Sequence, residues 1–150
     1  MSQGMSTKLC NELLVTGSLK SIFIVGNSAE LRIYSGAVPA HADDVITGTK
    51  IATVLGPSGA YLSFASTAAA GVLAKESATW EDPSAVGGVA THYRLVLHAD
   101  DDSADSGFIY ARIQGTVGSS GYNDMNVGST TIAASSVFTV NTFTQSLQPN

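Results

Sequence analysis

The chain has 150 residues, 44% of them hydrophobic and only 13% charged, and its formal net charge is −5. This length suits one domain with a hydrophobic core, and this apolar fraction excludes an intrinsically disordered chain. The acidic balance opposes the neutralisation of phosphates, so we expect no nucleic-acid partner.

Cysteine content and hydropathy exclude further classes of protein. Cys10 is the single cysteine, which excludes an internal disulfide framework. No basic segment followed by an apolar stretch opens the chain, and no apolar run reaches about 18 residues. We therefore expect a protein that is made in a cytosol and has no membrane partner.

The first 29 residues predict a short helical segment. Spacing of i and i+4 over residues 6–15 indicates an amphipathic helix that ends at Gly17, with Cys10 packed as a small core hydrophobe on the same face as Leu14. Ser18 can cap a second helical turn through Leu19, Ile22 and Phe23, although a buried strand over 22–25 fits the same residues.

From residue 30 onward, short alternating segments are separated by Gly, Pro, Asn, Asp and Ser. This texture is typical of antiparallel all-β domains. We predict a mostly β protein in two parts, an N-terminal helical contact segment over 1–29 and an antiparallel two-sheet β-sandwich or jelly-roll-like domain over 30–150. The expected strands are 31–34, 50–54, 60–65, 71–76, 78–81, 91–98, 107–117 and 137–147.

Alternation within these strands predicts which faces are buried. In 91–98, Tyr93, Leu95 and Leu97 share a core face, and the opposite face, which carries His92 and Arg94, is left to meet a partner. In 107–117 the better core face carries Ile109, Ala111, Ile113, Gly115 and Val117. We expect the lone Trp80 to fill the core rather than an interface.

Few residues indicate chemistry. The acidic run 100–105 is the best metal candidate, with Asp101 and Asp105 as weak calcium candidates. It lacks the glycine and the closing glutamate of an EF-hand, however. A solvated acidic loop explains the run better. His98 could form a hydrogen-bonded pair with Asp100. Glu76 and Glu81 fall on opposite faces of a regular strand, so they do not form the converging carboxylate pair that a glycosidase needs. We expect no cofactor and no enzymatic activity.

Two blocks carry a family pattern, LRIYSGAVPAHADD continuing to TGTKIA over 31–52, and RIQGTVG over 112–118. ATHYRL at 90–95 and NTFT at 141–144 follow the same order. Over about 31–144 the chain resembles a family of small tailed-bacteriophage virion proteins, whereas 17–29 is longer and more hydrophobic than the family pattern. Within the motifs, Gly48 is expected to adopt a positive φ and Gly115 to allow a close backbone approach.

The resemblance implies a capsid decoration, or cement, protein on the virion surface. Such a protein would bind the major capsid protein and itself as a dimer or trimer, and stabilise the head. The alternative is a tail, collar or head-fibre component, possibly a module that binds host-surface carbohydrate through Trp80, Tyr122 and the acidic loop. The candidate protein-contact residues are Leu9, Leu13, Leu14, Ile22, Phe23, Tyr61, Phe64 and Tyr122.

Overall fold

The computed structural model describes residues 3–15, 17–24 and 28–146. Within these residues the fold is mostly β with short helices, as predicted. The helices are α1 (Thr7–Val15), α2 (Leu19–Ile24) and a 3-10 turn (Pro57–Gly59). The strands are β1 (Gly4–Met5), β2 (Ala29–Tyr34), β3 (Lys50–Val54), β4 (Val72–Ala74), β5 (Trp80–Asp82), β6 (Gly88–Val89), β7 (His92–Leu97), β8 (Ile113–Gly118), β9 (Met125–Asn126), β10 (Thr131–Ile132), β11 (Phe138–Val140) and β12 (Thr144–Ser146).

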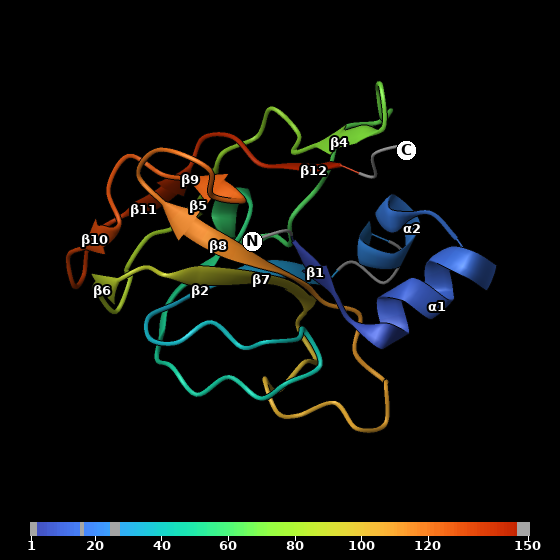
Figure 1. The fold of residues 1–150 in the computed structure, drawn as a ribbon. Coiled ribbons are helices and arrows are strands. Elements are labelled where there is room, and N and C mark those ends of the chain that lie inside the picture. The colour runs from blue at the N-terminus through green and yellow to red at the C-terminus, as the bar shows by residue number, and fades with distance from the viewer. Residues whose placement is uncertain (1–2, 16, 25–27, 147–150) are drawn as a thin grey trace.

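One six-stranded sheet organises the molecule. Its strands follow the order β1-β8-β7-β2-β3 with antiparallel pairing, and β9 pairs with β8 in parallel. The remaining strands form three two-stranded ribbons, β4–β12, β5–β11 and β6–β10. Figure 1 shows the β4–β12 ribbon on one side of the sheet and the two helices at one end. The layer that faces the sheet is thus made of ribbons and helices, and the described residues form no second continuous sheet.

The apolar face of the sheet forms the hydrophobic core. Alternation along β2 and β7 turns Leu31, Ile33, Tyr93 and Leu95 towards the helices and ribbons, and all four are fully buried. Trp80 is also fully buried, which confirms the prediction for this residue. The aromatic rings of the facing layer pack against one another as well; the T-shaped contact between Phe64 and Trp80 has a centroid distance of 5.4 Å.

Three predicted strands differ from the structure. Segment 60–65 contains only an isolated bridge at Phe64. Residues 107–112 are not a strand, because the Asp105 carboxylate accepts hydrogen bonds from the backbone N–H groups of Ile109 and Tyr110 and holds the chain in a turn. Segment 137–147 divides into β11 and β12, which pair with different partners, β5 and β4. The strands predicted at 31–34, 50–54 and 91–98 are confirmed with small changes of boundary.

The opposite face of the sheet is polar, yet it is buried as well. His92 and Arg94 are fully buried, and so is Arg112 just before β8. The loops over 35–49 and 98–112 cover this face, as the cyan and orange segments below the sheet show in Figure 1. The prediction that this face of β7 meets a partner is therefore wrong, because loops of the same chain already occupy it.

Arginine side chains tie both loops to the sheet. Arg112 donates to the two carboxylate oxygens of Asp100 at 2.6 and 2.8 Å, and to the carbonyls of Ala42 and Ser103 at 3.2 and 2.9 Å. Arg94 donates to the carbonyl of Asp44 at 2.7 Å. Arg32, Tyr34 and Gln114 make equivalent contacts to Asp100, Asp102 and Pro39. We call this set of buried side chains the arginine layer.

Two motif glycines allow close backbone packing. A Cβ at Gly48 would lie 1.8 Å from the carbonyl oxygen of Ser35, so this glycine serves a close approach rather than the positive φ that we expected. A Cβ at Gly115 would lie 2.7 Å from the ring of Tyr93, which confirms the predicted close approach.

We expect Arg112→Met to lower the free energy of unfolding by about 3–5 kcal/mol, because it leaves the Asp100 carboxylate buried without its partner. Lys8→Met is the matched control. Lys8 pairs with Glu12 at the surface of α1, and losing such a pair costs below about 0.5 kcal/mol. Urea unfolding followed by tryptophan fluorescence measures both. Similar losses for the two variants would contradict a structural role for the arginine layer.

His92 should make the stability depend on pH. Burial, together with the positive charge of Arg94, lowers the pKa of His92 from 6.5 to about 4. The unfolded state therefore binds one more proton than the folded state between these values, and the free energy of unfolding falls as pH falls from 6.5 to 4.

His92→Asn should remove this part of the pH dependence, whereas His41→Asn, at an exposed position, should keep it. Urea unfolding at several pH values between about 7 and 4.5 gives the slopes. Equal slopes for wild type and His92→Asn over this interval would rule out His92 as their source.

Candidate protein-contact site

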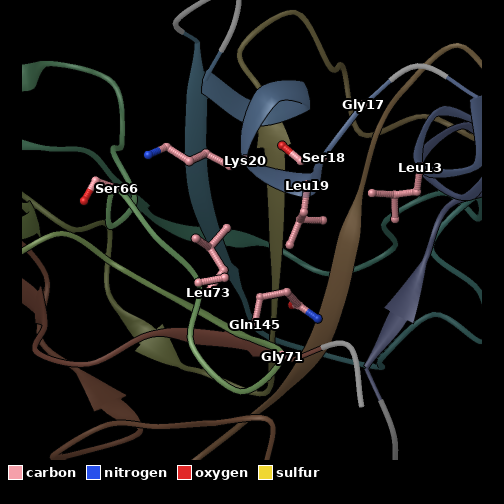
Figure 2. Close-up of a pocket in the computed structure, with 10 residues that line it drawn as sticks. Leu13, Gly17, Ser18, Leu19, Lys20, Ser66, Gly71, Leu73 and Gln145 are labelled. Atoms are coloured by element: carbon pink, nitrogen blue, oxygen red, sulfur yellow. The ribbon is translucent and has the colours of Figure 1, made fainter. Parts of the chain in front are cut away.

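A pocket opens between the two helices and the β4–β12 ribbon. Its volume is about 510 Å³, within the range of ligand sites, and most of its lining is apolar. Figure 2 shows Leu19 and Leu73 beside Gln145, with Lys20 reaching towards Ser66 at one end and Leu13 at the α1 side. The complete lining is Leu13, Gly17, Ser18, Leu19, Lys20, Ser66, Ala68, Gly71, Leu73 and Gln145.

Local sequence explains the walls of this pocket. The Ser18 hydroxyl accepts a hydrogen bond from the Ser21 N–H at 3.1 Å and caps α2, which confirms the predicted second helix. A Cβ at Gly17 would lie 2.5 Å from Ser21 Oγ, so a larger residue at this turn would displace the Ser21 hydroxyl. On the other wall, Ala70 and Gly71 both have positive φ and close the hairpin that leads into β4.

Helix α1 presents an apolar face to solvent. Leu9 is fully buried, whereas Leu14 and Val15 are 84% and 85% exposed. Cys10 is exposed on the same outer face. The predicted core position of Cys10 is therefore wrong. The helix has two apolar edges, and the one that carries Leu9 and Leu13 faces the protein.

The eight predicted contact residues divide between surface and core. Leu14, Tyr61 and Tyr122 are exposed, and Leu13 and Ile22 are partly buried against the core, with Leu13 lining the pocket. The other three, Leu9, Phe23 and Phe64, lie in the hydrophobic core and present no side-chain surface. Phe64 is therefore not available as a contact residue, because its ring packs against Trp80 and Phe143.

The two calcium candidates do not converge. Asp101 is exposed, and hydrogen bonds from the hydroxyl and N–H of Ser103 lower the pKa of its carboxyl group. Asp105 is buried and accepts hydrogen bonds from two backbone N–H groups. Within residues 3–15, 17–24 and 28–146, no three metal-ligating groups come together. Asp100 is buried as well, so the interpretation of the run as a solvated loop is wrong for Asp100 and Asp105.

The groups expected for a carbohydrate site do not form one surface either. Trp80 is fully buried, whereas Tyr122 is fully exposed. The separate prediction that His98 pairs with Asp100 is wrong, because His98 contacts Glu30 at 3.0 Å. Of that predicted site, Tyr122 and Asp101 are exposed to a ligand, whereas Trp80 is not.

Sequence reasoning missed most of the pocket. Lys20, Leu73 and Gln145 were not among the predicted contact residues. Alternation in the last strand does indicate that Gln145 is buried, because it lies on the same face as the buried Phe143. The pairing of β4 with β12, which brings residues 73 and 145 together, has no local sequence signal.

Two leucines of α1 test the assignment of its faces. Leu9→Ala should lower the free energy of unfolding by about 2–5 kcal/mol, because it leaves a cavity in the core. Leu14→Ala removes the same atoms from an exposed position, and its effect should stay within about 0.5 kcal/mol. Chemical denaturation measures both. A larger loss for Leu14→Ala than for Leu9→Ala would reverse the assignment.

Comparisons with known proteins give no family. No family model matches the chain, and no curated protein or solved structure matches it either. Among the described residues, neither helix has the length and apolar character needed to cross a membrane. The resemblance to phage virion proteins stays a prediction.

Proposed function

We propose that this protein is a non-enzymatic structural component of a tailed-phage virion, a capsid decoration protein that binds the major capsid protein and stabilises the head. The observation that carries the proposal is the apolar surface of α1, where Leu14 and Val15 are 84% and 85% exposed next to the apolar pocket. Large aliphatic groups exposed side by side favour a protein contact. The motifs over 31–144 supply the virion context.

Stabilisation of the shell follows from mass action. A protein that binds the assembled, expanded shell and not its free subunits lowers the free energy of the assembled state by an amount that grows with its concentration. The contact needs a rigid surface, and the capped helices and the arginine layer supply it. In this proposal the fold is a variant of the jelly-roll-like sandwich in which ribbons replace the second sheet, and the protein acts as a dimer or trimer.

A double variant tests the contact surface. Leu14→Asp with Val15→Asp should weaken binding to purified, expanded and undecorated capsids at least about tenfold, because it places two charges in an apolar contact. Val86→Asp is the control, since Val86 is an exposed valine in another part of the chain. Cosedimentation with capsids measures the affinities. Equal binding of all three proteins would exclude α1 as the contact.

Cys10 offers a direct measurement of the partner. It is the single cysteine, it is exposed, and it lies four residues before Leu14. A benzophenone attached to Cys10 should cross-link to the major capsid protein on illumination of decorated particles. Cross-links confined to tail or collar proteins would instead support the alternative location. Absence of both capsid binding and cross-links would remove the virion assignment.

The alternative as a carbohydrate-binding component rests on Tyr122, whose side chain is fully exposed. Exposed aromatic rings can stack on sugars, but Trp80, which was expected beside Tyr122, is buried in the core. A glycan array with the wild type and with Tyr122→Ala decides this case. A signal that Tyr122→Ala abolishes would support carbohydrate binding over decoration.

A further inference from the structure

A second, smaller pocket lies at the edge of the six-stranded sheet. β1 pairs with β8 only at Ile113 and Gln114, and β9 pairs with β8 only from Val117 onward. Among the described strands, none therefore pairs with this edge of β8 at residues 115–116. A pocket of about 250 Å³ opens there, lined by residues 3–4, 38–40, 114–116 and Asp124. We call it the edge pocket, and its volume suits one side chain rather than a drug-sized ligand.

Asp124 uses half of its carboxylate to close the open edge of β8. Its Oδ2 accepts hydrogen bonds from the N–H and the hydroxyl of Thr116 at 2.8 and 2.9 Å. Its Oδ1 has no hydrogen-bond partner among the described residues. The unpartnered side-chain atoms that are also sealed from solvent lie elsewhere in the described chain, on Trp80, His92, Arg94 and Gln145. Asp124 Oδ1 is therefore open to solvent and can accept from a ligand.

The side-chain donors of the edge pocket already have acceptors. The amide nitrogen of Gln114 donates to the carbonyl of Pro39 at 2.8 Å, and that of Gln3 donates to the hydroxyl of Tyr93. The amide oxygen of Gln3 has no partner among the described residues, and it is not one of the sealed atoms. The spare hydrogen-bonding capacity of these side chains is therefore for accepting, at Gln3 and at Asp124.

The charge of the edge pocket favours a cation. Among the described residues that line it, Asp124 is the one with a charged side chain. Spare acceptors beside a carboxylate suit a ligand that has a positive charge and several N–H donors. A calcium ion takes about six to eight oxygen ligands, usually from more than one carboxylate, so a single carboxylate is a poor site for it. Val38 and Pro39 add an apolar wall, which suits a weakly hydrated guanidinium better than a strongly hydrated ammonium.

We propose that the edge pocket binds the guanidinium group of an arginine side chain from a protein partner. The guanidinium donates N–H groups to Asp124 Oδ1 and to the amide oxygen of Gln3, and its flat face lies against the apolar wall. A lysine ammonium supplies the charge but not the planar group.

This inference rests on the proposed function for the identity of the partner, the major capsid protein. The chemistry of the edge pocket depends only on the side chains that line it. The net charge of −5 favours a partner with basic groups. β1, which lines the pocket, is followed directly by α1. One N-terminal segment would thus supply both the apolar surface at Leu14 and Val15 and one wall of an arginine site, and arginine is enriched among the residues that dominate interface energies.

A pair of matched small molecules tests the edge pocket. The first probe is N-acetyl-arginine amide. The second is N-acetyl-citrulline amide, which has the same shape but an uncharged urea in place of the guanidinium. NMR titration at constant ionic strength follows the backbone amides of Gly4, Gly115 and Thr116. We expect saturable shifts with the arginine probe, a dissociation constant of about 1–10 mM, and at least about tenfold weaker binding of the citrulline probe.

Two variants locate the binding. Asp124→Asn keeps an oxygen for Thr116 and replaces the free oxygen with an N–H donor, so it should weaken the arginine probe at least about tenfold. A Cβ at Gly4 would meet no atom within 4 Å, so Gly4→Val should fill the pocket without a clash and weaken the probe as well. Glu76→Gln is the control, because it removes the same charge at an exposed position outside the pocket. Dispersed amide spectra show that each variant has folded.

Four results would overturn the inference. These are equal affinity for the arginine and citrulline probes, tighter binding of N-acetyl-lysine amide than of the arginine probe, no shift of the three amides up to about 50 mM probe, and shifts with calcium chloride but not with arginine. The last result would assign the pocket to a metal cation.

Capsid binding separates this inference from the proposed function. Binding of the arginine probe together with no capsid binding would keep the edge pocket and remove the decoration role. Capsid binding that Asp124→Asn and Gly4→Val leave unchanged would keep the decoration role and overturn the assignment of the arginine to the capsid protein. Weaker capsid binding of both variants, with Glu76→Gln unchanged, is the expected result.

Discussion

The buried ion pair between Arg112 and Asp100 is the contact on which the rest of the fold depends. Both side chains have almost no exposure to solvent, so each would be strongly destabilising without the other. Arg112 donates two further N–H groups to the carbonyls of Ala42 and Ser103, which belong to the two covering loops. These hydrogen bonds of a buried guanidinium therefore require both loops to take one geometry. Arg94, whose pKa is lowered by burial and by the charge of Arg112, adds a second contact to the same loop at Asp44.

The geometry of these loops also fixes the position of α1, and with it one wall of the pocket between the helices and the β4–β12 ribbon. Asp43, next to Ala42, accepts hydrogen bonds from the N–H and hydroxyl of Thr7 and caps α1 from another part of the chain. Ser6 links the same helix to the sheet, because its hydroxyl accepts from the N–H of Arg112 and from the N–H of Leu9. The position of α1, and of the surface it exposes, is therefore set by the arginine layer on the far face of the sheet.

The sequence predicted what depends on local patterns. Alternation located β2, β3 and β7, and helical spacing with a serine cap located both helices. Burial of Trp80 followed from its size and from its place in an alternating segment. The orientation of α1 could not be predicted from the sequence, because two apolar pairs, Leu9 with Leu13 and Cys10 with Leu14, have the same spacing. Packing against the rest of the protein buries the first pair.

The features that were not predicted depend on contacts between residues that are distant in the chain. An acidic run such as 100–105 has the same composition whether it is solvated, binds a cation or neutralises buried arginines. The distinction lies in the register of β2 with β7 and of β7 with β8, which places Arg32 opposite Arg94 and Arg94 opposite Gln114. Like charges in register on a buried face require carboxylates from elsewhere, and the acidic run supplies them. A charged residue at alternate positions of several strands therefore indicates a covered polar face, provided that an acidic loop is available to close it.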